Sequence, residues 1–239
     1  MFNQLRKRAA EQEIMDDFSL GGGELREALR HLRRLNFIFG AAAPTCHGVA
    51  QLWREAGKPK SLSILDIGSG SGDVNRQLLR WAEDNRVALT ITLADITEEA
   101  CEEARHLFRG EPGIQIIRSD LFALPAHSAD IVTATQFVHH FSAHEVPRVV
   151  QSMLKTARLG VVINDIHRHW IPWAAVWLTT RMISRNRYIL HDGPLSVAKG
   201  FRGEDWQQLR TALGLSYKMD YAWRPLFRYV VVIRNSQAN

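Results

Sequence analysis

The sequence LDIGSGSGD at residues 65–73 continues the apolar run LSILDI, which begins at residue 62. An apolar run that enters a glycine-rich turn and then a helical pattern is typical of the first strand and helix of an open α/β sheet. Glycines at 68, 70 and 72 allow a tight turn and a close approach of the backbone to a ligand. Asp73 stands where a dinucleotide-binding G-x-G-x-x-G motif needs glycine, and the Lys-Ser/Thr pair of a P-loop is absent. The turn therefore predicts a ligand site of another kind.

Strand and helix patterns alternate from residue 61 onward. Short apolar runs occur at 62–67, 89–95, 114–120, 130–135 and 159–166, and helical patterns lie between them at 73–85, 97–108 and 142–156. Continuous apolar runs are expected of strands buried on both faces, and their alternation with helices predicts a doubly wound α/β domain. The connection after the third run is short, so we expect this crossover to be only partly helical. After an interruption, the pattern resumes with a helix at 203–213 and strands at 216–222 and 228–234.

We divide the chain into an N-terminal helical extension, residues 1–60, and an α/β domain, residues 61–239. Leucines at 25, 29, 32 and 35 recur at helical spacing in the extension, which is broken at residues 21–23 and 40–44. A helical insertion is predicted at about residues 167–200. The extension is expected to act as a lid.

Charge is distributed unevenly along the 239 residues. The net charge is +5, with +3 in residues 1–60, −5 in residues 61–165 and +7 in residues 166–239. A nucleic-acid binder more often gathers its basic residues with aromatics on the main domain, so we expect no nucleic-acid partner. The basic flanks are instead expected to form an acceptor pocket that favours a lipophilic molecule with a polar or anionic group.

Two sequence features bear on the cellular compartment. Cys46 and Cys101 lie far from any paired spacing, which argues against a disulfide framework or a cysteine zinc site and favours a cytoplasmic location. The N-terminus has no apolar signal region, and the longest apolar stretch, residues 170–178, is about half of the roughly 20 residues that a spanning helix needs. No integral membrane segment is expected.

Acidic residues close two further strand runs. Asp95 follows the second run, where a carboxylate can accept both hydroxyls of a ribose, and Asp120 follows the third, where it can accept from an adenine amino group. An adenosine ligand without a pyrophosphate accounts for both acids and for the glycine turn. Taken alone, Asp66 or Asp120 could instead be a helix cap or a turn residue.

These motifs resemble those of the class I S-adenosylmethionine-dependent methyltransferases. LDIGSGSGD resembles their first motif, LADI the acidic second-strand motif, SDLFALP the adenine-contacting motif and RLGVVINDI the fifth strand. FRGEDWQQLRTALGLS and the terminal hairpin resemble the last helix and the antiparallel seventh strand. The resemblance covers residues 60–239 apart from the insertion, and it implies a seven-stranded, mostly parallel, Rossmann-like sheet that binds S-adenosylmethionine and releases S-adenosylhomocysteine.

The resemblance also implies a set of cofactor contacts. Asp66 would organise the ammonium of the methionine part, and Gln136 would face the sulfonium. Gly68, Ser69 and Gly70 would flank the methionine part, Asp95 and Ile96 would take the ribose and the adenine edge, and Asp120 and Leu121 would take the adenine. In the lid, Arg33, Arg34, Asn36 and Phe37 are expected to close over the cofactor, with Arg34 and Asn36 contacting it.

Methyl transfer to oxygen or carbon also requires that a proton leave the acceptor, and histidine is the usual general base near neutral pH. His139 and His140 follow the fourth strand, beside the expected methyl position. Asp165, after the fifth strand, and His191, in the insertion, are further candidates for catalysis. The alternative is that the histidine pair only structures its loop, since HH is common there in the family.

The insertion carries three tryptophans, Trp170, Trp173 and Trp177, at helical spacing, followed by arginines and by the turn-like HDGP at residues 191–194. We expect this stripe, with His167 and Arg187, to line an apolar acceptor pocket. The alternative is that the stripe packs onto the sheet domain.

The resulting hypothesis is a methyltransferase for a small aromatic or lipophilic acceptor, acting on a phenolic hydroxyl in secondary metabolism, as in bacterial phenolic and polyketide methyltransferases. Carbon methylation of a quinol or polyketide ring is the alternative, followed by a non-catalytic S-adenosylmethionine-binding module. Nucleic-acid methylation is disfavoured because TQFVHH stands where an Asn-Pro-Pro-Tyr motif would follow the fourth strand. No metal is expected, and the chain is expected to be a monomer or a homodimer.

Overall fold

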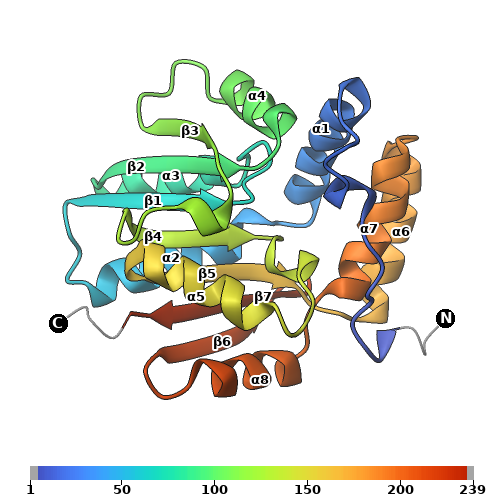
Figure 1. Cartoon of the computed structure of the whole chain (residues 1–239). Helices are drawn as coiled ribbons and strands as arrows, with labels where there is room; N and C mark the ends of the chain where they lie inside the picture. The colour runs from blue at the N-terminus through green and yellow to red at the C-terminus, as the bar shows by residue number, and fades with distance from the viewer. Residues whose placement is uncertain (1–4, 236–239) are drawn as a thin grey trace.

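A single sheet of seven strands forms the centre of the computed structural model, which describes residues 5–235 (Figure 1). The order is β3-β2-β1-β4-β5-β7-β6, and only β7 runs antiparallel to its neighbours. The strands are β1 (Ser61–Ile67), β2 (Ala88–Asp95), β3 (Ile114–Arg118), β4 (Ala129–Thr135), β5 (Ala157–Ile166), β6 (Lys218–Arg224) and β7 (Arg228–Arg234). The predicted seven-stranded, mostly parallel sheet is confirmed.

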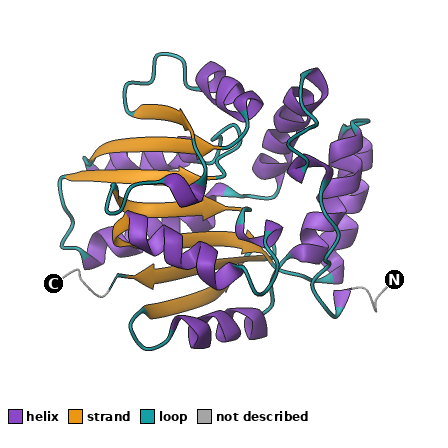
Figure 2. Cartoon of the chain, viewed as in Figure 1, coloured by secondary structure: helices purple, strands orange, loops and turns teal. Residues whose placement is uncertain are grey.

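Helices cover both faces of the sheet, as the buried strand patterns predict (Figure 2). One face packs against α2 (Ala42–Glu55), α3 (Asn75–Asn85) and α4 (Glu98–Leu107), and the other against α5 (Val146–Thr156) and α8 (Gly203–Leu213). Alternate residues of each strand point to opposite faces, so Ile131 packs on the first layer and Val132 on the second. The central strands are therefore mostly apolar, apart from buried polar residues such as Asp66, Thr133 and Asp165.

The crossover from β3 to β4 contains only a short 3₁₀ turn, η3 (Leu121–Ala123), in place of a full helix. β3 ends at Arg118, so Asp120 lies beyond the strand, where it caps η3 by accepting from the Phe122 N–H. The expectation of a partly helical crossover is met, although the predicted run 114–120 is two residues too long.

A helical cap covers the edge of the sheet where β1 to β5 end. The cap consists of α1 (Gly23–Ile38), α6 (Trp170–Ile183), α7 (Arg187–Lys199) and the short turn η2 (Ile14–Asp16), and the arrowheads of these strands point toward it in Figure 1. Leu25 and Leu29 of α1 pack against Tyr188 and Ile189 of α7. Residues 8–17, here called the strap, run along α7; the first four residues of the predicted extension lie outside the described residues.

The HDGP segment, predicted to be a turn, lies inside α7. Gly193 has Val176 and Thr180 of α6 directly against its α-carbon, so the glycine permits close packing of the two helices and does not mark a turn. Pro194 is accommodated within the same helix. None of the described helices is long and apolar enough to cross a bilayer.

Candidate active site

One cavity of about 990 Å³ lies between the carboxyl edge of the sheet and the cap. It is lined by the glycine turn, the ends of β2 and β4, the inner face of α1, the strap and one face of α7. Ligand sites for single small molecules span roughly 300–1,000 Å³. The cavity is therefore large enough for a cofactor and an acceptor together.

The glycine turn has the left-handed backbone that its sequence predicts. Gly68 and Gly70 have φ of 59° and 55°, where glycine is favoured. A Cβ at Gly68 would collide with the Phe137 ring, whereas a Cβ at Gly70 would find only Leu29, at 3.8 Å. The space above Gly70 is open and is continuous with the cavity, so this turn can cradle a ligand.

Asp66 lies at the bottom of the cavity and is almost fully buried. Its carboxylate accepts hydrogen bonds of 2.6 Å from the Thr133 hydroxyl and from the Asn75 amide. Burial raises the pKa of Asp66 to about 6, and the nearby carboxylates of Asp73 and Asp95 contribute to the rise. A cationic group bound here would relieve both effects.

The other predicted cofactor acids also line the cavity. Asp95 accepts from the backbone N–H of Gly70 at 2.9 Å and from that of Thr97 at 3.0 Å, which holds the ends of β1 and β2 together. Its Oδ1 also accepts from the Thr97 hydroxyl at 2.9 Å, whereas its Oδ2 keeps a lone pair for a further donor. Ile96, Leu121 and Asp120 are neighbours on the same wall.

The lid closes through Asn36 of α1. Its amide nitrogen lies 3.3 Å from both carboxylate oxygens of Asp73, and its oxygen accepts from the Gln136 amide at 2.6 Å. Gln136 also accepts from the buried Arg228 guanidinium at 3.4 Å. Asp73, quoted in the glycine motif but not predicted as a site residue, therefore belongs to the cavity wall.

His139 and Asp165 form a buried pair at the end of β4 and β5. The His139 Nδ1 lies 2.7 Å from an Asp165 carboxylate oxygen, and Asp165 also accepts from the backbone N–H groups of His139 and Ile166. Burial lowers the pKa of His139, but the carboxylates of Asp165 and Glu13 outweigh burial and raise it to about 9. Asp165 does not line the cavity; it orients the ring that does.

The strap brings residues to the site that the sequence did not single out. Arg8 donates to the backbone carbonyls of Lys199, His139 and Phe141, and Asp192 of α7 accepts from two consecutive N–H groups at Ile14 and Met15. The anchored strap places Glu13 and Asp16 beside the histidine pair. Nothing in the local sequence marks these acids, because only the folded cap brings residue 13 next to residue 139.

Arg34 and His191, both predicted as site residues, also lie outside the cavity. Arg34 is exposed on the outer face of α1, beside Arg30 and Glu27, while Asn36 faces inward. His191 is ion-paired with Asp192 and Glu11 at the surface of α7, and its neighbour Asp192 is the residue that reaches the cavity. The helical path of α7 turns adjacent residues about 100° apart, which separates the two side chains. Phe37 is also exposed, so it does not close the lid.

The tryptophan stripe does not line the cavity either. The inner face of α6 carries Pro172, Val176 and Thr180, four residues apart, and the latter two pack on Gly193. The predicted stripe, Trp170, Trp173 and Trp177, lies roughly a quarter turn further round the helix. Trp170 and Trp177 are half-exposed.

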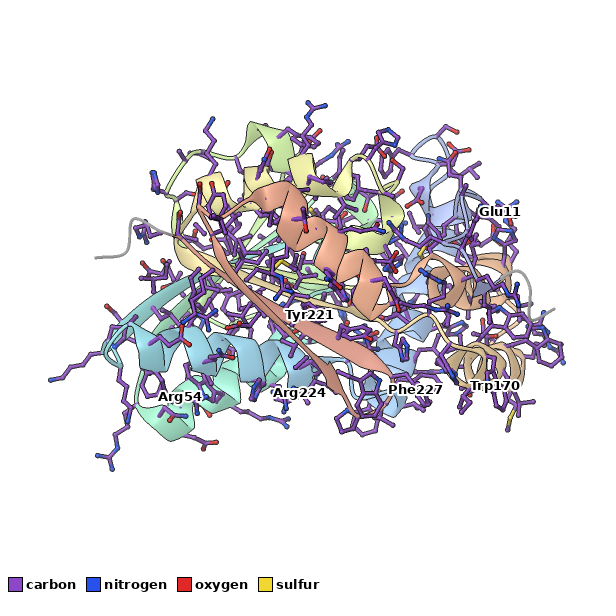
Figure 3. All side chains as sticks on the ribbon, turned by 90° about the horizontal axis from the view of Figure 1, so that it is seen from below. Glu11, Arg54, Trp170, Tyr221, Arg224 and Phe227 are labelled. Carbon is purple, nitrogen blue, oxygen red and sulfur yellow. The ribbon has the colours of Figure 1, made fainter. Side chains whose placement is uncertain are left out.

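The remaining predicted acceptor residues lie on the outside with this stripe. Figure 3 shows Trp170 on the same side of the molecule as Phe227 in the β6–β7 turn, and the His169 ring lies between them, 5.9 Å and 5.5 Å from the two. His167 stacks near the same rings, and burial lowers its pKa to about 4. Arg187 pairs with Glu24 on the surface. The expectation that these residues line the acceptor pocket is therefore wrong.

Negative charge dominates the cavity, contrary to the expectation of a basic pocket. Among the described residues, one arginine and one lysine line it, Arg8 and Lys199, together with His139, whose pKa is raised to about 9. Nine carboxylates line it as well: Glu11, Glu13, Asp16, Asp66, Asp73, Asp95, Asp120, Glu145 and Asp192. Basic residues of the flanks are used elsewhere, for example in the pair of Arg234 with Glu55. The acidic lining fits S-adenosylmethionine, whose sulfonium and ammonium groups are cationic. The methionine part of this cofactor needs an open space beside the backbone, such as the one at Gly70.

A family model described as a methyltransferase domain matches residues 64–160, which hold the glycine turn, both strand-end acids and the histidine pair. Residues 64–160 form a methyltransferase domain. The resemblance drawn from the motifs is thereby confirmed. No curated protein matches the chain.

Solved structures similar to this methyltransferase share its fold at low identity. A SAM-dependent methyltransferase from Aquifex aeolicus has a TM-score of 0.60 and 14% identity, over 87% of this chain and 97% of that one. The plantazolicin methyltransferase BpumL, solved with a monoazolic desmethylPZN analog and SAH, has a TM-score of 0.65 and 13% identity, over 87% and 90%. The citrinin polyketide synthase CMeT domain has a TM-score of 0.53 and 19% identity, over 74% of this chain but only 46% of that one.

Proposed function

We propose that this methyltransferase uses S-adenosylmethionine to methylate a hydroxyl oxygen on a small acceptor with an aromatic or otherwise apolar body. The observation that carries the proposal is that a single cavity contains both the cofactor-type residues, Asp66, Gly70 and Asp95, and the polar cluster at His139. A site that only bound the cofactor would not need a second polar end.

The proposal assigns the two ends of the cavity to two ligands. At one end, Asp66, Asp95 and Asp120 would hold the ammonium, the ribose and the adenine. At the other end, apolar side chains offer a surface for the body of the acceptor: Met15, Phe18, Phe137, Phe141 and Ile189. The cofactor, when bound, supplies a methyl group already activated by its sulfonium.

The chain's own contribution to catalysis is positioning and exclusion of water. Holding donor and acceptor in near-attack geometry can account for much of the rate of such a displacement. The strap and α1 cover the cavity, and His139, fixed by Asp165, presents its Nε2 edge to the acceptor end. An acceptor hydroxyl placed there would meet His139, His140 and Glu13, which are the groups available to take up or hold its proton.

The acidic wall refines the acceptor class. Glu11, Asp16, Asp192 and Glu145 surround the acceptor end, and a carboxylate or phosphate on the acceptor would have to approach them. We therefore propose an acceptor that is neutral before reaction, such as a phenol, in place of the anionic acceptor considered from the charge of the flanks.

The test begins with calorimetry of S-adenosylmethionine binding, followed by turnover on a panel of neutral phenols and quinols. Product analysis by NMR then assigns the new methyl group to oxygen or carbon. Absence of binding at millimolar cofactor would refute cofactor use, and transfer to carbon would replace the oxygen assignment by the carbon alternative. Binding without any turnover on the panel would favour the non-catalytic module.

A further inference from the structure

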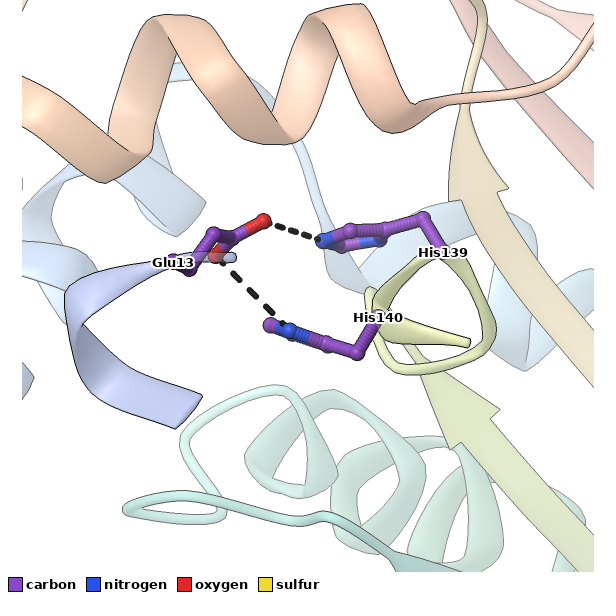
Figure 4. Close-up of side chains that lie close together, drawn as sticks. All are labelled: Glu13, His139 and His140. Atoms are coloured by element: carbon purple, nitrogen blue, oxygen red, sulfur yellow. Dashed lines mark ion pairs between the residues drawn. The ribbon is translucent and has the colours of Figure 1, made fainter. Parts of the chain in front are cut away.

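Three side chains from two distant segments meet at the acceptor end of the cavity. Glu13 lies on η2, and His139 and His140 lie on η4 (Val138–His140); Figure 4 shows the carboxylate facing both rings. The Glu13 Oε1 is 3.5 Å from the His139 Nε2, and the Oε2 is 3.8 Å from the His140 Nδ1. One ligand-type atom from each residue lies within 4.8 Å of the others.

The facing atoms of this cluster have no hydrogen-bond partner among the described residues. Glu13 Oε1, His139 Nε2 and His140 Nδ1 are all buried and form no hydrogen bond of good geometry, although each lies within ion-pair distance of an oppositely charged group. Glu13 and His139 are only 3% and 2% exposed, so water does not reach them freely. Buried polar atoms without partners are rare and costly in native proteins. Two nitrogens and an oxygen aimed at one another form a set of ligand atoms that a cation could bind in place of the histidine protons.

Asp165 gives His139 the orientation that a metal ligand needs. Its oxygen lies 2.7 Å from Nδ1 and can accept the proton of that nitrogen, while Nε2 is directed at Glu13. Because the pKa of His139 is raised to about 9, a metal ion would have to displace the Nε2 proton. Metal-binding histidines usually donate their other N–H to a carboxylate in this way. Asp165 is itself fixed by the backbone N–H groups of His139 and Ile166. The His139 ring is therefore fixed at Nδ1 by Asp165, while its Nε2 faces Glu13.

The local charges also favour a cation. Glu13 and Asp16 face one ammonium, Lys199, at 3.6 Å and 3.3 Å, besides the two imidazoles. Asp16 Oδ1 lies 2.7 Å from the His140 Nδ1, so it adds negative charge beside the three ligand residues. Lys199 balances one of the two negative charges of Glu13 and Asp16. The second charge can be balanced by a proton on a histidine or by a metal ion.

We propose that Glu13, His139 and His140 bind a divalent transition-metal ion at the acceptor end of the cavity. Two imidazoles and a carboxylate suit zinc and its first-row neighbours. Tetrahedral bonds of about 2.0–2.1 Å place ligand atoms roughly 3.4 Å apart, close to the separations in the cluster. Three protein ligands leave one position for water or for an acceptor hydroxyl.

The metal would explain how an acceptor hydroxyl is activated. A cation held there would stabilise the acceptor oxygen once its proton has passed to the Asp16 carboxylate and on to solvent. That oxygen would take the methyl group, and the sulfonium would leave as neutral S-adenosylhomocysteine. This role rests on the proposed function, whereas the metal site itself does not. No metal was expected from the sequence. The folded structure brings together Glu13 and the histidine pair, which lie far apart in the chain.

The test titrates Zn²⁺ and Co²⁺ into chelator-treated protein without cofactor or acceptor, using calorimetry for Zn²⁺ and visible absorption for Co²⁺. We expect one ion per chain with a micromolar or lower Kd and intense Co²⁺ bands of low coordination number. Glu13→Gln, His139→Gln and His140→Gln should each weaken binding at least tenfold.

The matched controls are Asp17→Asn on the same strap and His144→Gln in the same loop, both exposed and outside the cavity lining, which should leave the affinity unchanged. Circular dichroism checks that each variant is folded. If a variant at a buried residue unfolds, the metal affinity of His140→Gln still tests the site, because His140 is partly exposed. Wild-type protein that binds no ion at millimolar Zn²⁺, or binding that survives His140→Gln, would overturn the site. Metal binding without turnover would instead count against the proposed function alone.

Discussion

The fold shifts the protonation equilibria of individual side chains at the cavity away from their values in water. Asp66 is the clearest case, because its pKa is raised from 3.8 to about 6 by burial, with Asp73 and Asp95 adding repulsion. A group with a higher pKa in the folded state stabilises the fold at low pH, and this stability is lost as the pH rises from about 4 to 6. In the protein without ligand, the ionised form of Asp66 is therefore destabilised by burial and by its acidic neighbours, and a bound cationic group would offset this cost.

The first prediction concerns the pH dependence of cofactor affinity. Because the cofactor's ammonium would pair with the ionised Asp66, the Kd for S-adenosylmethionine should rise about tenfold for each pH unit below pH 6. Asp66→Asn should flatten this profile, weaken binding at pH 7 at least tenfold and raise apo stability by the order of 1 kcal/mol. Calorimetry between pH 5 and 8 measures the first two effects. The exposed Asp84→Asn on α3 is the control, and an unchanged profile in Asp66→Asn would contradict the assignment.

The second prediction compares two glycines that share a backbone conformation. Gly68→Ala and Gly70→Ala both put an L-residue at positive φ, which costs about 1–2 kcal/mol. Only Gly68→Ala also collides with Phe137, so it should lose roughly 3 kcal/mol and melt about 10 °C lower. Gly70→Ala should melt only a few degrees lower but bind cofactor at least tenfold more weakly. Equal melting temperatures, or normal affinity in Gly70→Ala, would show that the cradle is misassigned.

At the level of elements, the strap is the part whose position depends most on a few contacts. Arg8 ties it to the carbonyls of Lys199, His139 and Phe141, and Asp192 holds its middle by two backbone N–H groups. These bonds join the N-terminal segment to η4 and α7, which lie more than a hundred residues away in sequence. The acceptor end of the cavity is complete only while the strap is in place.

The third prediction follows from the anchoring role of Arg8. Arg8→Ala should destabilise the closed strap locally by about 2 kcal/mol and speed hydrogen exchange at Ala9, Ile14 and Met15 about thirtyfold. Affinity for S-adenosylmethionine should change little, because the cofactor residues are on other elements. Arg6→Ala, at an exposed residue of the same segment, is the control. Exchange that stays at the wild-type rate in Arg8→Ala would mean that the strap is held by other contacts.

At the level of the whole molecule, charge is sorted between the cavity and the surface. The cofactor region is acidic in sequence, and the fold concentrates that acidity in the cavity, while basic residues form pairs such as Arg187 with Glu24 on the outside. The positive net charge of the chain therefore says little about the ligand. The cytoplasmic location and the monomeric or dimeric state stay predictions.

The fourth prediction uses this sorted charge. For two acceptors of the same shape, one a neutral phenol and the other carrying an added carboxylate, kcat/KM should favour the neutral one at least tenfold at low ionic strength. The preference should shrink as salt screens the nine carboxylates of the cavity. A preference for the anionic acceptor would contradict the proposed neutral acceptor. It would instead support a basic acceptor pocket elsewhere in the cap, as the charge of the flanks predicts.

The sequence by itself determined the sheet, its helical layers and the cofactor end of the cavity. These features depend on local signals: apolar runs, a glycine turn, and acids at strand ends that a parallel sheet necessarily brings to one edge. Asp66, Gly70, Asp95 and Asp120 all lie where that logic puts them.

Only the tertiary structure decided the acceptor end. The inward face of α6 is set by the close fit of Val176 and Thr180 to Gly193. The positions of the aromatic residues in the sequence do not show which face turns inward. The meeting of Glu13 with His139 and His140 depends on a strap anchored by backbone carbonyls, which any sequence could supply. Contacts between segments so far apart leave no periodicity or spacing in the chain, so the fold had to be known before the candidate metal site could be seen.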